Sequence, residues 1–335
     1  MQVEQFDPLT ATAAELDECV SVEYAASEPD QAAGPAQTRQ SLLARLTRVP
    51  LPGRRYLHWT ASTRPGGPVG GVAWLVLEGN QPTDLAAIDV TVHPGFRREG
   101  MGTALLREIA GAASDRQCLL AEGLIDGSAG QAWAASLGFA VVQQTVLLGL
   151  DVTTADRDRW QVTAPPGYRL AEWTGSTPTG LLGSYAVARD AIREAPHGEM
   201  SFTEPSWTPD RVRDEEATAR ARECELRVAT AIHEPTGVIA GLTYLEVYQA
   251  RPGVAVQQDT AVLAAHRGHG LGIWLKAANL RRLVADHPAV TLVTTSNAAD
   301  NVHMLRVNEK AGFLVTARTE IREAELGALR TRLGL

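Results

Sequence analysis

A glycine-rich turn led by an arginine, residues 267–272 (RGHGLG), is the stretch of this 335-residue sequence whose residue types best fit chemistry. It follows a β-branched and apolar run, residues 257–264, and precedes a segment with apolar residues at helical spacing. Glycines let a backbone approach a ligand closely, and the free N–H groups of a first helical turn point toward an anion. The pattern therefore predicts a phosphate-binding turn between a strand and a helix.

The spacing of the glycines excludes two common phosphate loops. No Gly-Lys-Ser/Thr follows, as a Walker A loop requires, and the Gly-x-Gly-x-x-Gly of dinucleotide-binding domains is absent. Arg-x-x-Gly-x-Gly between a strand and a helix instead resembles the pyrophosphate-binding turn of the GCN5-related N-acetyltransferases (GNATs), which in that family holds acetyl-CoA. Residues 301–313 follow Asn-x-x-Met-x-x-x-Asn-x-x-x-Gly-Phe. This is similar to the next motif of the family, which usually reads Asn-x-x-Ala-x-x-x-Tyr-x-x-x-Gly-Phe.

The sequence contains the first of these patterns twice. Residues 88–102 align without a gap on residues 258–272, which places Arg97, Gly100 and Gly102 on the arginine and two glycines of the later turn. A Gly-Phe pair, residues 138–139, follows in the first copy as residues 312–313 do in the second. A repeat this long indicates two copies of one domain. We predict a first domain at 1–150, a linker at 151–167 and a second domain at 168–335.

The resemblance implies an α/β fold of the α+β kind: two tandem GNAT folds, each with a mixed, mostly antiparallel central sheet flanked by helices. Strand patterns in the first copy are at 3–6, 55–61, 69–78, 85–93, 118–125 and 140–150, the last of which should close the sheet, and helix patterns are at 12–25, 37–48, 101–113 and 129–137. In the second copy, strands are expected at 168–173, 226–233, 237–248, 257–264 and 314–323, and helices at 179–191 and 209–222. The turn-rich segment 27–37 should link the first two helices.

The resemblance also implies which residues hold acetyl-CoA, whose product is CoA. The turn binds through backbone N–H groups, and a backbone N–H near residues 262–264, where two central strands diverge, polarises the acetyl carbonyl. In the second copy the implied cofactor-binding residues are Val262, Leu263, Ala264, Arg267, Gly268, His269, Gly270, Leu271, Gly272 and Asn301. In the first copy they are Val92, Arg97, Arg98, Gly100, Met101, Gly102 and Thr103.

Transfer to an amine also needs a base, because an alkylammonium has a pKa near 10.4 and cannot attack until it loses a proton. GNATs often use a Glu or Asp on the central strands, which points to Asp259 or Glu246, and either can instead be a structural carboxylate. The family's leaving-group acid is usually a Tyr at the position of Asn308. An amide cannot supply a proton as a phenol does, but it can donate a hydrogen bond to the sulfur or the pantetheine.

The two copies differ in the second motif. Gly127 and Ala134 stand where the second copy has Asn301 and Asn308, so we assign catalysis to the second copy. Asp89 matches Asp259, so catalysis by the first copy remains an alternative. The long stretch 194–210 is either a lid that contributes to the acceptor site or a plain connection.

Composition limits the classes of protein. The net charge of −8 argues against nucleic acid and is compatible with a cationic amine. No apolar run approaches the ~18 residues of a membrane span, and the N-terminal residues lack the pattern of a signal peptide. The three cysteines fit neither a metal site nor a disulfide framework, so we expect no metal. Together these features predict a cytoplasmic protein that does not bind a membrane.

The sequence thus predicts an acyltransferase that moves acetyl from acetyl-CoA to a primary amine of a small molecule, such as an antibiotic or an amino acid-like metabolite. Mycothiol synthase-like and protein acetyltransferases are enzymatic alternatives. A non-catalytic acetyl-CoA sensor or partner-binding module is the alternative from another class, because the first copy's second motif is eroded and the second copy lacks the Tyr. A monomer and a homodimer are both compatible with the sequence.

Overall fold

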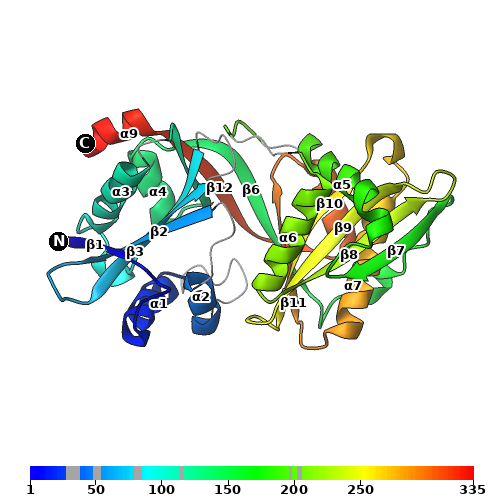
Figure 1. Cartoon of the computed structure of the whole chain (residues 1–335), viewed down its shortest axis with the longest axis horizontal. Coiled ribbons are helices and arrows are strands. Elements are labelled where there is room, and N and C mark those ends of the chain that lie inside the picture. Colours follow the sequence, from blue (N-terminus) through cyan, green and yellow to red (C-terminus); the bar gives the residue numbers. More distant parts are fainter. Residues whose placement is uncertain (28–37, 48–53, 79–84, 114–115, 196–197, 202–205) are drawn as a thin grey trace. The chain divides into compact units, whose positions relative to one another are not determined.

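The computed structural model describes residues 1–27, 38–47, 54–78, 85–113, 116–195, 198–201 and 206–335 (Figure 1). The chain divides into two compact units. Unit 1 comprises Met1–Thr145, Gly198–Phe202 and Ala317–Leu335, and unit 2 comprises Val146–His197 and Thr203–Thr316.

Unit 1 is a mixed sheet with helices on both faces. Its strands, in spatial order, are β1 (Gln2–Phe6), β2 (Arg54–Ser62), β3 (Val69–Glu78), β4 (Leu85–Val92), β5 (Cys118–Ile125) and β12 (Leu314–Glu325). Neighbours are antiparallel except β4 and β5, which are parallel. One face carries α1 (Ala13–Ser27) and α2 (Arg39–Leu46), and the other carries α3 (Met101–Ala112) and α4 (Ala129–Ser136), as Figure 1 shows.

The core of unit 1 lies between α3 and the sheet. Leu105, Leu106 and Ile109 recur at helical spacing and are fully buried against the sheet. The helix α9 (Leu326–Leu333), which the sequence patterns did not predict, adds Leu329 and Leu333 to the same core. The C-terminal residues therefore help to stabilise the unit that begins the chain.

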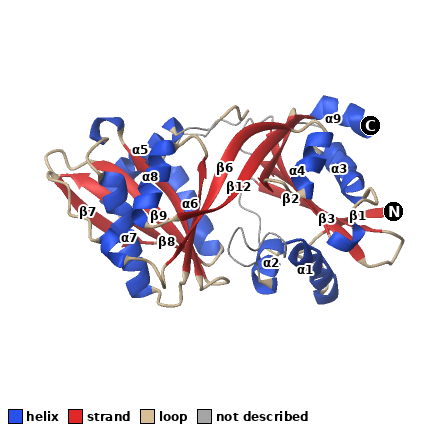
Figure 2. Cartoon of the chain, turned by 180° about the vertical axis from the view of Figure 1, so that it is seen from behind, coloured by secondary structure: helices blue, strands red, loops and turns tan. Residues whose placement is uncertain are grey.

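Unit 2 repeats the arrangement. Its strands, in spatial order, are β6 (Ala140–Asp151), β11 (Leu292–Ala298), β10 (Val254–Val262), β9 (Ile239–Tyr248), β8 (Cys224–His233) and β7 (Tyr168–Thr174), with β10 and β11 parallel. The helices α5 (Leu182–Asp190) and α6 (Pro209–Ala221) cover one face (Figure 1). The other face carries α7 (Leu271–Asp286) and α8 (Val302–Ala311), in front in Figure 2. β8 and β9 begin 170 residues after β2 and β3, which confirms the repeat.

The prediction that residues 140–150 close the first copy's sheet is wrong. β12 pairs with β5, with Ala324 opposite Leu119, and β6 is the strand next to β11. The two last strands are thus exchanged between the copies. Thr145 and Thr319 share a hydrogen bond in unit 1, and Thr316 donates to the Leu147 carbonyl in unit 2. A strand pattern predicts the strand but not its partner, because two final strands with similar patterns can each pair with the edge of either sheet.

The other predicted elements are present. The predicted strands 69–78 and 118–125 have the bounds of β3 and β5. The predicted helix 179–191 is interrupted: 3₁₀ turns, Thr179–Leu181 and Ala191–Glu194, flank α5. The predicted linker 27–37 lies outside the described residues except for its first, and so do parts of the stretch 194–210. Among the described residues, no helix combines the length and apolar character needed to cross a bilayer.

Candidate functional site

The two glycine-rich turns have the same backbone shape. Gly270 and Gly100 hold φ at +77° and +83° and precede α7 and α3, and neither helix start has a side-chain cap. Two residues earlier, Gly268 has φ +83° and Arg98 has φ +69°, an unfavourable angle for a residue with a Cβ. Two left-handed residues before an uncapped helix leave several N–H groups turned toward one point. The geometry of both turns fits a pyrophosphate.

The arginine that begins each turn donates a hydrogen bond to the strand that precedes the turn. Arg97 Nε donates to the Val92 carbonyl and Arg267 Nε to the Val262 carbonyl, both at 3.2 Å. Arg267 Nη2 also contacts the Glu194 carboxylate at 2.5 Å. These contacts give the two arginines a structural role, and half of the Arg267 side chain remains exposed.

The diverging strands leave one edge of β4 and of β10 open. The parallel pairing of β4 with β5 ends at Ile88 and Ala121, and that of β10 with β11 ends at Val256 and Thr294. The N–H of Leu263 donates to the Ala240 carbonyl at 2.9 Å on the β9 side. Successive amides alternate between the two edges of a strand, so the Val262 N–H points to the open edge.

The same alternation holds in unit 1, where the His93 N–H donates to the Gly70 carbonyl at 2.9 Å. The amide of Val92 therefore points to the open edge of β4. Val92 and Val262 are therefore among the amides on the open edges, whereas Leu263 is already engaged. Met101 and Leu271 contribute only backbone to the turns, because their side chains are buried in the cores.

Three histidines surround Tyr168 next to the turn of unit 2. Tyr168 Oη lies 2.9 Å from His266 Nδ1, and the rings of His233 and His266 are 4.8 Å apart. The ring of His269, predicted to bind the cofactor, packs on Tyr168. Burial and the neighbouring imidazoles lower the pKa of His266. No spacing in the sequence groups these residues, because they come from different elements.

Asp259, one of the two predicted bases, lies beside a buried arginine. Its Oδ2 is 3.3 Å from Nη2 of Arg189, and Glu215 binds the same guanidinium at 2.7 Å and 3.2 Å. The guanidinium stacks on Trp207 at 3.7 Å and on Tyr244 at 4.6 Å and is 2% exposed. Burial alone would lower the pKa of Arg189, but its tyrosine and carboxylate neighbours raise it, so Arg189 stays charged. The positively charged guanidinium of Arg189 therefore occupies the space beside Asp259 and Tyr244 in unit 2.

Glu246, the other predicted base, has two donors on one oxygen. Tyr248 Oη lies 2.9 Å and Gln258 Nε2 2.7 Å from its Oε2. Tyr244 is near both carboxylates. Its burial and, second, the negative charge of Asp259 raise its pKa well above the ordinary value. The structure brings both predicted carboxylates near one neutral tyrosine, but each already has a partner.

The asparagines of the second motif have different roles. Asn301 caps α8, with Oδ1 accepting from the Met304 N–H at 3.1 Å. Asn308 is fully buried and donates Nδ2 to Asn297 at 2.6 Å. Its Oδ1 is buried and, within the described residues, has no hydrogen-bond partner. The atom of Asn308 that remains for a ligand is thus an acceptor, suited to an amide N–H or a thiol rather than to a thiolate.

Lys276 on α7 is a buried residue that the sequence analysis passed over. Burial lowers its pKa from the ordinary value of 10.5 to about 7, and the Asp259 carboxylate acts in the opposite direction. The ammonium lies 5.7 Å from the centre of the Phe313 ring. Unit 1 has Leu106 at the equivalent position, 170 residues earlier. The helical spacing from Ile273 and Leu280 was the signal that Lys276 faces inward.

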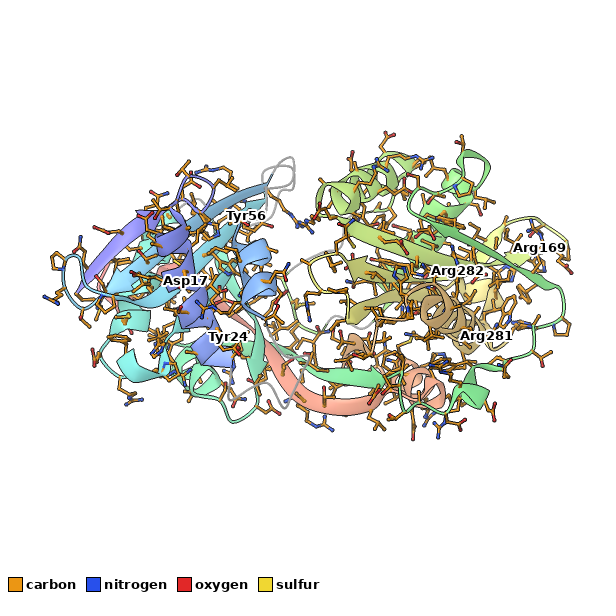
Figure 3. The ribbon with its side chains drawn as sticks, turned by 90° about the horizontal axis from the view of Figure 1, so that it is seen from below. Asp17, Tyr24, Tyr56, Arg169, Arg281 and Arg282 are labelled. Carbon is orange, nitrogen blue, oxygen red and sulfur yellow. The ribbon has the colours of Figure 1, made fainter. Side chains whose placement is uncertain are left out.

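Unit 1 contains a cavity of about 450 Å³ on the face of α1 and α2. Most of its wall is apolar, with side chains from α1, α2, β2–β5 and β12 and from Met200. The ionisable groups are Arg54, Tyr56 (labelled in Figure 3), His58, Glu122 and the ion pair of Glu23 and Arg45. None of them belongs to a motif that the sequence predicts. The alternation of side chains along β2, β3 and β5 was the available signal.

Within the described residues, no group of three or more His, Cys, Asp or Glu side chains is placed to hold a metal ion. Figure 3 shows two further arginines, Arg281 and Arg282, on α7. Both donate to main-chain carbonyls, Arg281 to Trp160 and Arg282 to Trp173, so they fix segments of unit 2 rather than line a site.

Comparisons with known proteins agree with this geometry. The model of the Acetyltransferase (GNAT) family matches residues 25–139. The chain is 27% identical over 270 residues to a mycothiol acetyltransferase of Mycobacterium sp. (strain JLS), covering 80% of this chain and 83% of that one. A mycothiol acetyltransferase of Mycobacterium leprae (strain TN) is 25% identical over 261 residues, covering 75% and 78%.

Solved structures share the fold over nearly the whole chain. A tandem GNAT protein from the clavulanic acid biosynthesis pathway, solved without acetyl-CoA, has a TM-score of 0.77 and 28% identity and covers 97% of this chain and 99% of its own. A GCN5-related N-acetyltransferase from Sphaerobacter thermophilus has a TM-score of 0.68 at 17% identity, covering 97% and 95%. Residues 25–139 thus match the GNAT family of acetyltransferases, and the whole chain, with two matching turns on two matching sheets, shares the fold of a tandem GNAT protein.

Proposed function

We propose that the protein transfers an acetyl group from acetyl-CoA to a primary amine of a small molecule. The observation that carries the proposal is the shared geometry of the two turns, each with two left-handed residues before an uncapped helix and an open strand edge behind it. Such a turn can hold a pyrophosphate while the extended pantetheine pairs along the open edge, with its thioester at Val92 or Val262.

The proposed reaction is direct attack on the thioester. A base takes one proton from the ammonium group, and the free amine nitrogen then bonds to the acetyl carbon. The C–S bond breaks, and the second proton from the nitrogen ends on sulfur, which yields the amide and CoA. The protein has to hold the carbonyl at an N–H, accept the first proton and exclude water.

The base remains a prediction. Asp259 and Glu246 are the residues proposed from the sequence of the second copy, and both already accept hydrogen bonds from neighbours. Protonating Asp259 would weaken the ion pair that holds Arg189. This geometry is a reason to test the first copy as well as the second.

The amine itself is proposed only by class. The relatives named mycothiol acetyltransferase favour an amine related to mycothiol as one candidate. The relative from the clavulanic acid pathway favours an antibiotic-related or amino acid-like amine as another. Protein acetylation stays an alternative. We also infer that the protein works in the cytoplasm as a monomer or homodimer, without nucleic acid or membrane.

A non-catalytic acetyl-CoA sensor is the second candidate function. It is favoured by the guanidinium of Arg189, which fills the space beside Asp259 in unit 2, and by Asn308 in place of a proton donor. A sensor binds acetyl-CoA with the same turns but releases no thiol when amines are added.

The experiment is a thiol-release assay with purified protein, acetyl-CoA and a library of primary amines, followed by mass spectrometry of the products. The proposal predicts release that depends on one class of amine, with a product heavier by one acetyl group. Binding of acetyl-CoA with no amine-dependent release would favour the sensor. Without binding and without release, both candidates fall.

A further inference from the structure

We propose that the cavity of unit 1 is an acceptor site for a small organic ammonium compound with an aromatic or aliphatic body, and that Glu122 binds its ammonium group. This inference rests on the proposed function and assigns the acceptor to the first copy. Five structural observations support it: the position of the cavity, its wall, the free carboxylate of Glu122, a cation at the equivalent place in unit 2, and the partners already held by the two arginines that line the cavity.

The cavity lies where the strands of unit 1 diverge. Leu85 and Ala87 of β4 and Leu120 and Glu122 of β5 line it. The pairing of the two strands ends at Ile88 and Ala121, so Glu122 is the first residue beyond the last pair. The open edge of β4 that carries the Val92 amide begins at the same point. The cavity therefore lies at the start of the open edge along which we propose that the pantetheine is held.

The wall combines flat aromatic and aliphatic surfaces. Tyr56 and Trp74 come from adjacent strands and are partly exposed, and Leu46 and Val76 also line the space. A wall of this kind binds the apolar body of a ligand, and an aromatic face also attracts a cation. A volume of about 450 Å³ is within the range of sites for small molecules.

Glu122 is the free carboxylate of this wall. Within the described part of the chain it has no hydrogen bond or ion pair, and its surface is exposed to the cavity. The protein atoms around it desolvate the carboxyl and raise its pKa. Glu122 is solvent-exposed at the cavity wall, and a carboxylate with no protein partner there attracts a cationic ligand. His58 stays neutral, since burial lowers its pKa, and does not compete as a cation.

Unit 2 supplies the precedent for a cation at this position. Tyr244 is 170 residues after Trp74, and the guanidinium of Arg189 covers its ring. Asn297 stands where unit 1 has Glu122, because Val293 pairs with Ala255 as Cys118 pairs with Leu85. Unit 2 therefore holds its own side chain as a cation on the aromatic wall, whereas unit 1 presents the wall and a free carboxylate to a cavity.

An anionic ligand fits less well. Arg45 is the cation of α2 that lines the cavity, and it is paired with Glu23 at 2.9 Å. Arg54, at the start of β2, is also engaged with a partner. The free charge on the wall is thus negative, so a ligand carrying only a carboxylate would have to displace an existing ion pair.

The test uses tyramine as the ammonium probe and 4-ethylphenol as its neutral analogue, titrated calorimetrically into the full-length protein without acetyl-CoA. We expect tyramine to bind at least tenfold more tightly than 4-ethylphenol. Glu122→Gln, which has nearly the same shape, should weaken tyramine at least tenfold and leave 4-ethylphenol unchanged. Glu108→Gln, on the exposed surface of α3, is the matched control and should change neither. A second variant, Ala87→Phe, should fill the cavity and abolish binding of both probes.

Equal affinities for the two probes, an unchanged tyramine affinity in Glu122→Gln, or no binding of tyramine would overturn the inference. Thiol release separates it from the proposed function. If amines release thiol and Glu122→Gln releases it equally well, acetyl transfer stands and the acceptor site does not. If tyramine binding depends on Glu122 but no amine releases thiol, the ammonium site stands and acetyl transfer does not.

Discussion

The carboxylate of Asp259 and the guanidinium of Arg189 form an ion pair of 3.3 Å, although 70 residues separate them in the chain. Arg189 is almost completely buried, and Asp259 is one of two carboxylates that neutralise it. The residue that the sequence proposes as a base thus also stabilises a buried charge. Because a buried cation without partners is costly, removing the charge of Asp259 should lower the stability of unit 2.

Asp259→Asn should destabilise unit 2 by about 1–3 kcal/mol, since Arg189 keeps Glu215 but loses one charged partner. We expect amine-dependent thiol release to remain. Urea unfolding of wild type, Asp259→Asn and the matched unit 1 variant Asp89→Asn gives the stabilities, and the release assay gives the rates. A fall in kcat of about 10² or more, at unchanged stability and in Asp259→Asn alone, would identify Asp259 as the base instead.

Lys276 should make the stability of the protein depend on pH above neutrality. The folded chain releases this proton at about pH 7, whereas an unfolded chain keeps it until about pH 10.5. Between these values the unfolded state binds more protons, so the free energy of unfolding should rise with pH by about 1.4 kcal/mol per unit from this group. Lys276→Leu, the residue that unit 1 has at this position, should remove the slope and stabilise most at pH 7 and below.

The exposed Lys310, the other lysine of the chain, gives the control for that measurement. Lys310→Leu should leave the slope of stability against pH as it is in the wild type. Chemical unfolding at a series of pH values from 6 to 10 measures both variants. An unaltered slope in Lys276→Leu would mean that the ammonium group has access to water or to a stronger partner.

The exchanged strands predict that unit 1 needs the end of the chain. Leu329 of α9 is 1% exposed in the core of unit 1, so Leu329→Ala should cost about 2–5 kcal/mol there. Leu335→Ala, at a residue 54% exposed, should be within about 0.5 kcal/mol of wild type. Proteolysis with mass spectrometry identifies the unit that opens. Opening of unit 2 rather than unit 1 in Leu329→Ala, or a stably folded fragment of residues 1–150, would contradict the exchange.

The sequence predicted the features that depend on residues close together in the chain. The turns, the repeat and most helices and strands follow from local spacing, and Gly100 and Gly270 hold the left-handed angles that their residue type indicated. The partner of β12 could not be predicted, because both final strands have similar patterns. The contacts of Asp259 depend on α5 and α6, and the role proposed for Glu122 depends on a cavity lined by α1, α2, β2–β5 and β12. Local spacing indicates which face of a strand a side chain occupies, but not which elements pack against that face.

The central claim is tested most directly by calorimetric titration of the protein with acetyl-CoA, in wild type, Gly100→Asp and Gly270→Asp. Each aspartate would add strain and a negative charge at the start of α3 or α7. The account predicts binding to the wild type, and each variant should lose at least tenfold in affinity at its own turn and none at the other. Absence of binding to the wild type, or full binding to the double variant, would contradict the assignment of these turns to acetyl-CoA.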